Sequence, residues 1–292
     1  CCPAPRRRRK IYVHSPFRYL IQTYMDDFFK ELQEENGLTS RKKSGANEIE
    51  RMFLKLDGFL ARNDYAEAEK LLRYYLSEAE TDGSFQMRIA VLNELMGLYR
   101  KLGRREDAYS AVEKSTAAIV AGKLSDTVTD ATVSLNAATV YKCFGEDEKA
   151  LELYEQARII YERELIPTDE RLAGLYNNEA LALTSLGRFK QARHFFNNAL
   201  EIITKKENGA PEAAITYLNL ADMTVAESGE GGALQADEYV QLAQRLLDPD
   251  KNLRDGNYAF VCEKCAPVFE RYGYFDFAEQ IKKESERIYE RS

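Results

Sequence analysis

The clearest copy of a pattern that recurs along this chain is Leu183-Thr-Ser-Leu-Gly187-Arg-Phe189-Lys-Gln-Ala192-Arg-His-Phe-Phe196-Asn-Asn-Ala199. The pattern consists of a large residue, a Gly four positions later, an Ala five positions after the Gly, and then a bulky and a small residue. Residues 141–157 and 99–115 repeat it with the same spacing, except that the last has Ser at the final position. Internal repeats of this kind are typical of proteins built by stacking one structural unit.

Weaker copies extend the array toward both ends of the chain. The residues at the Ala position are Ala68, Ala108, Ala150, Ala192, Ala236 and Ala278, with separations of 40, 42, 42, 44 and 42 residues. A short insertion, residues 227–232, precedes the fifth of these alanines. The spacing therefore predicts six copies of one unit.

Each copy is predicted to be a pair of antiparallel helices joined at the Gly. Gly adopts the left-handed conformation that ends a helix without a steric penalty, and a small Ala early in the second helix lets the two backbones approach closely. One pair cannot bury its apolar face alone, so successive pairs stack on one another. The predicted fold is all-α, a right-handed alpha-alpha superhelix (solenoid) of about six helix pairs with an N-terminal helix.

The pattern resembles the tetratricopeptide repeat (TPR). The residues that carry the resemblance in the fourth copy are Tyr176, Glu179, Ala180, Leu183, Ala192, Phe196 and Ala199. The period near 42 residues and the segments 177–183 and 151–158 are similar to the kinesin-light-chain subtype of this repeat. The resemblance covers roughly residues 47 to 291, and it implies a scaffold that binds proteins or peptides on a concave face formed by the first helix of each pair.

The chain divides into three predicted parts. Residues 1–15 contain the basic run Arg6–Lys10 and are expected to form a disordered arm, and residues 16–46 are expected to form an amphipathic helix and a flexible connector. Residues 47–292 form the predicted TPR solenoid. The N-terminal helix is interpreted as a cover for the first pair, with a dimer or membrane-surface helix as the alternative. In the last pair, Lys282 and Ser285 replace bulky and small packing residues, which is expected of a terminal unit that faces water.

Composition limits the class of partner and the compartment. The formal net charge is −7, which disfavours nucleic acid as the default partner. The five cysteines form no framework of spaced pairs, so we interpret them as reduced thiols of a cytoplasmic protein. No apolar stretch approaches the length of a membrane span. The Arg6–Lys10 run keeps one alternative open, a sensor or regulatory protein whose arm contacts nucleic acid.

The resemblance also implies candidate residues for a peptide-binding groove. Register places these on the concave face: Asn93, Glu94, Arg100, Lys101, Asn136, Thr139, Lys142, Asn177, Asn178, Thr184, Asn219 and Asp222. Asn occupies the same position in three successive copies, at Asn136, Asn178 and Asn219. Its amide can donate and accept at once, which suits a grip on an extended peptide, but it can also bridge helices within the scaffold. The carboxylate clamp of the family is not matched, because its basic positions are not basic here.

Signals for catalysis are weak. His194 is expected on a solvated surface, and Cys262-x-x-Cys265 has metal-ligand spacing without a second pair, so core packing is the preferred interpretation. We expect no catalytic, cofactor or metal site, and we predict a protein- or peptide-binding adaptor rather than an enzyme. The sequence does not indicate an oligomeric state.

Overall fold

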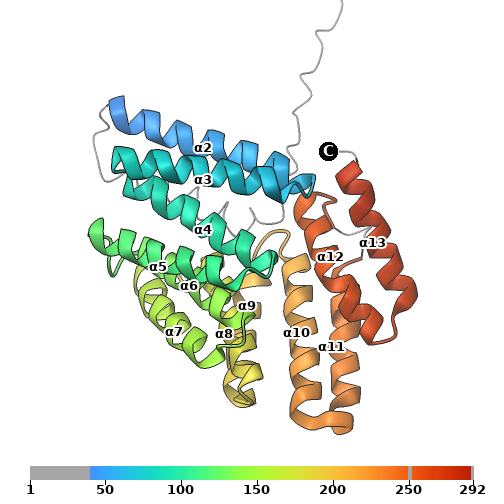
Figure 1. Ribbon diagram of the computed structural model, residues 1–292. Coiled ribbons are helices and arrows are strands. Elements are labelled where there is room, and N and C mark those ends of the chain that lie inside the picture. The colour runs from blue at the N-terminus through green and yellow to red at the C-terminus, as the bar shows by residue number, and fades with distance from the viewer. Residues whose placement is uncertain (1–39, 249–251, 291–292) are drawn as a thin grey trace, which may run out of the picture.

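The computed structural model describes residues 40–248 and 252–290, and every α-helix in this part of the chain belongs to a pair (Figure 1). The pairs are α2 (Ser40–Ala61) with α3 (Tyr65–Asp82), α4 (Phe85–Lys101) with α5 (Arg105–Ala121), α6 (Val128–Cys143) with α7 (Asp147–Glu164), α8 (Glu170–Ser185) with α9 (Phe189–Ile203), α10 (Ala210–Ser228) with α11 (Ala233–Leu246), and α12 (Gly256–Arg271) with α13 (Phe275–Glu290). The predicted all-α solenoid of six helix pairs is confirmed.

The turn inside each pair uses the expected backbone chemistry. Gly187, between α8 and α9, has a φ of 70°, a conformation that only Gly adopts without strain. The next amide, Arg188 N–H, donates to the Leu183 carbonyl at 2.8 Å, which closes the end of α8. In the first pair Asn63 takes the place of Gly with a φ of 56°, as Asn tolerates this region better than most residues.

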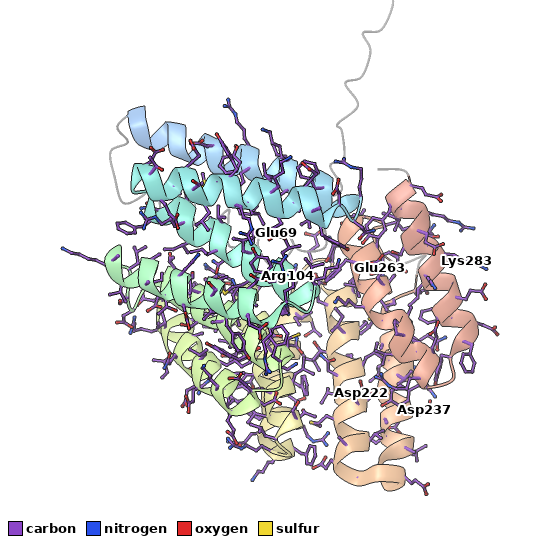
Figure 2. All side chains as sticks on the ribbon, viewed as in Figure 1. Glu69, Arg104, Asp222, Asp237, Glu263 and Lys283 are labelled. Atoms are coloured by element: carbon purple, nitrogen blue, oxygen red, sulfur yellow. The ribbon has the colours of Figure 1, made fainter. Side chains whose placement is uncertain are left out.

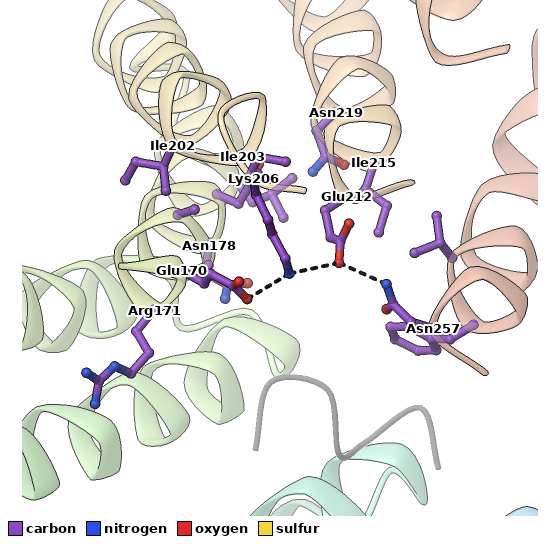
Figure 3. A pocket seen from close by; sticks show the side chains of 16 residues that line it. Glu170, Arg171, Asn178, Ile202, Ile203, Lys206, Glu212, Ile215, Asn219 and Asn257 are labelled. Carbon is purple, nitrogen blue, oxygen red and sulfur yellow. Dashed lines mark hydrogen bonds and ion pairs between the residues drawn. The ribbon is translucent and has the colours of Figure 1, made fainter. Parts of the chain in front are cut away.

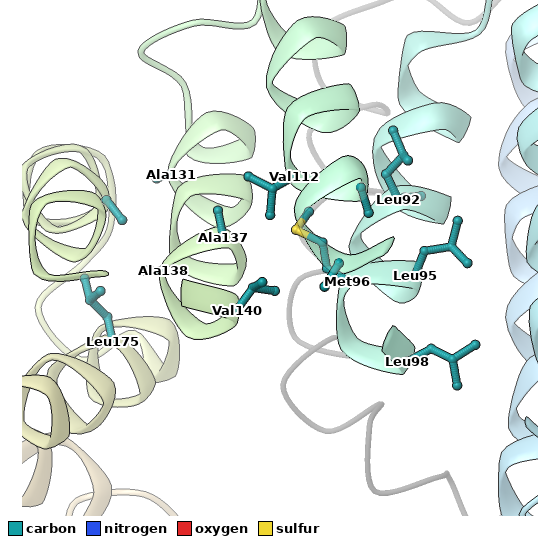
Figure 4. Packing of buried hydrophobic residues seen from close by; sticks show 14 of the residues in the cluster. Leu92, Leu95, Met96, Leu98, Val112, Ala131, Ala137, Ala138, Val140 and Leu175 are labelled. Atoms are coloured by element: carbon teal, nitrogen blue, oxygen red, sulfur yellow. The ribbon is translucent and has the colours of Figure 1, made fainter. Parts of the chain in front are cut away.

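The repeated alanines lie where the two helices of a pair meet. Ala68, Ala108, Ala150, Ala192, Ala236 and Ala278 are all 0% exposed. Larger residues such as Tyr154 and Phe196, one turn further on, are also fully buried. Figure 4 shows the same principle between successive pairs, where Met96 and Val112 pack toward Ala137 and Val140 of α6. The core is thus a chain of local contacts along the array.

The array curves strongly. Contacts run within pairs and between the first helices of successive pairs, from α2 through α4, α6, α8 and α10 to α12. In Figure 1 the last pair, α12–α13, returns to lie beside the first elements of the array. The first helices therefore surround a common inner side, and this concave side is where the resemblance places a binding surface.

Two details at the ends differ from expectation. Helix α2 begins at Ser40, so the last part of the expected connector is helical. In the last helix, Lys282 is exposed as predicted, but Glu284 and Ser285 are buried. Glu284 pairs with Arg254 at 3.0 Å and Arg287 at 3.4 Å, because the segment before α12 folds back onto α13. The expected N-terminal arm and the helix after residue 15 lie outside the described residues.

Two further features agree with the chain's local chemistry. The insertion at residues 227–232 forms the end of α10 and a short 3-10 helix, η1 (Gly229–Gly232), so it lengthens one turn without breaking the array. Helix α12 stays continuous through the exposed Pro267. No helix in the described part of the chain is long and apolar enough to cross a membrane.

Candidate functional site

The concave side contains three adjoining cavities. The first, here called the apolar cavity, has a volume of about 220 Å³ and lies between α8, α9, α10 and α12. Leu181, Ile203, Ile215 and Phe260 supply much of its wall. Such a surface suits an apolar side chain, since burial in it removes hydrocarbon from water.

Polar groups at the edge of the apolar cavity are tied together in a chain of contacts (Figure 3). Lys206 Nζ lies 2.8 Å from Glu170 Oε2 and 3.7 Å from Glu212 Oε1. The Asn257 amide donates to the same Glu212 oxygen at 2.9 Å. These contacts join α8, α10 and α12 around the cavity opening.

The asparagines predicted for the groove divide into two kinds. The Asn177 amide donates to the buried Thr216 hydroxyl at 2.9 Å and so bridges α8 to α10. Asn178 and Asn219 also line the apolar cavity, and their side chains form no hydrogen bond within the described residues. Asn177 lines the same cavity, but its amide nitrogen is used within the scaffold, whereas the amides of Asn178 and Asn219 make no such bridge.

The second cavity, here called the basic cavity, has a volume of about 400 Å³ and lies between α4, α6 and α12. Its lining includes Arg100 and Lys101 at the end of α4, Asn136 on α6, and Glu263 and Lys264 on α12. The second and sixth helix pairs thus face each other across this cavity. Figure 2 shows Glu263 on α12 close to the end of α4.

A narrower third cavity of about 130 Å³ connects the other two. It shares Asn93, Arg100 and Asn136 with the basic cavity, and it shares Arg171 and Asn178 with the apolar cavity. The three together, here called the inner channel, adjoin one another through these shared residues, with a basic end and an apolar end.

Asn93 is the polar group with the clearest need for a ligand. It is 7% exposed, it lines both the basic and the connecting cavities, and neither its Nδ2 nor its Oδ1 has a hydrogen-bond partner among the described residues. A buried amide without partners costs roughly 1–3 kcal/mol, and such groups are rare in folded proteins. A bound peptide offers both the acceptor and the donor that Asn93 lacks.

The electrostatics of the basic end follow from crowding. Burial lowers the pKa of Lys264, and the positive charges of Arg100 and Lys101 lower it further. Burial also lowers the pKa of Lys142, with Arg100 contributing in the same direction and Asp147 opposing it. Arg100 and Lys142 are partly buried, Lys101 and Lys264 are exposed, and Glu263 opposes the shift of the Lys264 pKa. The like charges lie close enough to repel one another, a condition that an anion would relieve.

Other predicted groove residues are engaged within the scaffold. Asp222 pairs with Arg271 at 2.5 Å and accepts from the Tyr272 hydroxyl at 3.0 Å, so it fastens α10 to α12. The hydroxyl of Thr184 donates to its own helix, at the Ala180 carbonyl. Thr139 lines the basic cavity while its hydroxyl bonds the Leu135 carbonyl at 2.9 Å. Glu94 lies in the lining of both the basic and connecting cavities.

Several residues that line the inner channel, chiefly on α12, were not predicted from the sequence. Phe260 contributes to both the apolar and the basic cavities, and Lys264 and Asn257 line one each. The sixth copy of the repeat is weak, and no groove residues were assigned to it. The alignment of α12 with the first helices of the other copies was the signal that could have identified these residues.

The side chains considered for chemistry occupy ordinary positions. His194 is exposed, and Cys262 and Cys265 are buried in the core as predicted. Burial raises the pKa of Cys262 to about 12 and raises that of Cys265 as well, so both thiols stay protonated at neutral pH. Within residues 40–248 and 252–290, no cluster of three or more His, Cys, Asp or Glu side chains is arranged to hold a metal ion.

Solved structures with this architecture provide an external comparison. BtubC (BKLC) from P. vanneervenii is 20% identical, covers 79% of this chain and 90% of its own, and has a TM-score of 0.60. A variant of a Podosopora anserina protein, described as a kinesin light chain with nearly identical TPR-like repeats, is 18% identical over 69% of this chain and 94% of its own, with a TM-score of 0.50. The fold is that of TPR-like repeat proteins.

A third TPR-like match is NprR in complex with its cognate peptide NprX. It is 16% identical, covers 92% of this chain and 75% of its own, and has a TM-score of 0.56. No protein-family model and no curated protein matches the sequence. The comparisons confirm the predicted TPR resemblance at the level of fold. The expected cytoplasmic location and the alternative role as a sensor linked to nucleic acid stay predictions.

Proposed function

We propose that this TPR-like chain is a protein- or peptide-binding adaptor or scaffold, and that its binding surface is the inner channel. The observation that carries the proposal is Asn93, a buried amide that lines two cavities and whose two polar atoms find no hydrogen-bond partner within residues 40–248 and 252–290. An extended peptide backbone supplies donors and acceptors at regular intervals, which matches an amide of this kind.

The shape of the channel supports a peptide over a small molecule. The cavities adjoin one another, and Asn136, Asn178 and Asn219 of three successive first helices line them. Amides at one position of successive repeats fit a ligand that also extends from repeat to repeat. The apolar cavity then receives one side chain, and the amides grip the backbone beside it.

The test is selection of peptides from a displayed random library against the full chain. We expect selected peptides to bind the wild type and to bind the Asn136/Asn178/Asn219→Ala variant at least about tenfold more weakly, a loss of about 1.4 kcal/mol. The matched control removes three exposed amides on second helices, in the Gln156/Asn197/Gln235→Ala variant, and should bind like the wild type.

Circular dichroism and thermal melts first establish that the three proteins are equally folded. Equal binding by both variants would place the working surface outside the inner channel and overturn the proposal. Failure to select any peptide would likewise count against a peptide-binding role.

A further inference from the structure

We infer that the basic cavity binds an acidic segment of a partner protein, whose carboxylates are held between the second and the sixth helix pairs. This inference rests on the proposed function and adds to it the chemistry of the partner. It concerns one end of the inner channel, where the cations come from helices far apart in the sequence.

The first step is the local reversal of charge. The chain as a whole carries a formal net charge of −7. At the basic cavity, by contrast, Arg100 and Lys101 of α4 and Lys264 of α12 line the wall, and Lys142 of α6 stands near Arg100. The opposing carboxylates in the wall are those of Glu94 and Glu263. A local excess of positive charge in an acidic protein attracts an anion to this cavity.

The second step concerns how three of these cations are paired, with Glu263 the carboxylate that acts on Lys264. Arg100, Lys142 and Lys264 form no salt bridge within the described part of the chain, although carboxylates elsewhere in the fold are extensively paired. Lys264 contacts the Phe260 ring at 5.5 Å instead. Cations that are partly desolvated and crowded together gain stability when an anion binds.

The third step identifies a peptide segment as the source of the anion. The lining of the basic cavity includes Asn93, which is buried and has no hydrogen-bond partner in the part of the chain that the structure describes. The smallest cavity shares lining residues with both the basic and the apolar cavities. An isolated inorganic anion does not need an adjacent amide that both donates and accepts, nor a path to an apolar site. A polypeptide with acidic side chains near an apolar one uses all three features.

The arrangement also has a geometric consequence. Lys264 belongs to the sixth pair and Arg100 to the second, and the two cations lie on facing walls of one cavity. An acidic segment that contacts both replaces repulsion across the cavity with attraction. Binding therefore draws α4 and α12 together, and neutralising either side alone should weaken it.

The experiment uses the full chain and three fluorescent peptides of equal length, in which the charged positions are all Glu, all Gln or all Lys. We expect the Glu peptide alone to bind, with affinity that falls as salt rises. The Arg100→Gln and Lys264→Gln variants should each bind it about tenfold more weakly or worse. The matched control, Arg245→Gln with Lys282→Gln, removes exposed cations of second helices and should bind normally.

Three results would overturn the inference. Equal affinity for the Glu and Gln peptides would show that charge does not select the partner. Full competition by inorganic phosphate or citrate at the affinity of the peptide would make the ligand a small anion.

The third result concerns four acidic residues of the expected N-terminal helix: Asp26, Asp27, Glu31 and Glu34. If the Glu peptide binds only after these are changed to amides, the occupant of the basic cavity is an acidic segment of this chain and not a partner protein. In each case the library-selected peptides and the Asn136/Asn178/Asn219→Ala variant still report separately on the proposed function.

Discussion

The Tyr272 hydroxyl donates to Oδ1 of Asp222 at 3.0 Å, a contact that fastens α12 to α10. Burial and the nearby Asp222 charge both raise the pKa of the tyrosine, so the hydroxyl remains a donor at physiological pH. Arg271 adds an ion pair to the same carboxylate. A residue that register alone places in a ligand groove thus holds the last pair in position.

We predict that Asp222→Asn lowers the free energy of unfolding by about 1 kcal/mol, the value of a typical hydrogen bond with partial exposure. Chemical denaturation measures the loss. Library-selected peptides should still bind, because Asp222 lies outside the inner channel. Glu238→Gln, at an exposed position of α11, is the matched control with no expected change. Loss of peptide binding by a folded Asp222→Asn protein would contradict the structural role.

The adjacent residues Asn177 and Asn178 provide an internal comparison. Asn177→Ala removes a hydrogen bond to the buried Thr216 hydroxyl and should lower the free energy of unfolding by about 1–2 kcal/mol. Asn178→Ala removes a side chain without partners in the described structure and should change it by no more than about 0.5 kcal/mol. Peptide binding should be weakened more by Asn178→Ala than by Asn177→Ala. Similar stability losses at the two positions would mean that both amides are structural.

Replacing a repeated alanine with a larger side chain should destabilise the fold. Ala150 and Ala192 are 0% exposed at the contact between paired helices, so Ala150→Leu or Ala192→Leu should destabilise by about 1–3 kcal/mol through overpacking. Thermal or urea melts give the values. Ala117→Leu makes the same substitution at an exposed position of α5 and should leave the free energy of unfolding nearly unchanged. Neutral behaviour at Ala150 would be inconsistent with the packing described here.

Glu179 predicts a pH dependence with a definite sign. It is 3% exposed, and burial raises its pKa to about 7, although the Arg158 guanidinium at 3.2 Å lowers it. The folded state therefore binds a proton more tightly than the unfolded state. This group's contribution to stability is complete below about pH 4.5 and is lost as the pH rises through about 7.

The Glu179→Gln variant should lack this loss. Relative to the wild type, its free energy of unfolding should increase between about pH 4.5 and pH 7, by at most about 3 kcal/mol. Urea denaturation at several pH values measures the difference. Glu155→Gln, on the same ion cluster but more exposed, should show a much smaller change. A flat difference for Glu179→Gln would mean that folding does not raise the pKa of this carboxyl group.

The fold was predictable because its decisive contacts are local. Gly187 must take a left-handed conformation and Ala192 must be small, and both requirements recur at a fixed spacing that the sequence displays directly. The weak sixth copy was recognised from Gly273 and Ala278 for the same reason. Because each turn requires a residue that tolerates positive φ and each helix contact requires a small residue, these residue types recur at a fixed spacing in the sequence. The number of helix pairs and their approximate boundaries follow from that spacing.

The composition of the site was only partly predictable. Register identified residues on the first helices, but it did not separate two neighbours that line one cavity, Asn177, which bonds Thr216, and Asn178, which does not. It also did not place Lys264 opposite Arg100. That proximity depends on curvature, the sum of small rotations between successive pairs, and no single repeat carries the information.

Because α12 returns toward α4, we expect the array to respond to force as an elastic coil whose two ends lie close together. Most contacts among the described helices lie within a pair or join neighbouring pairs, so tension on the two ends should spread as small adjustments over every joint before any pair unfolds. The gap between α4 and α12 is where these adjustments add up. We therefore expect a partner bound in this gap to stiffen the whole coil, and a pull on either end to weaken its binding.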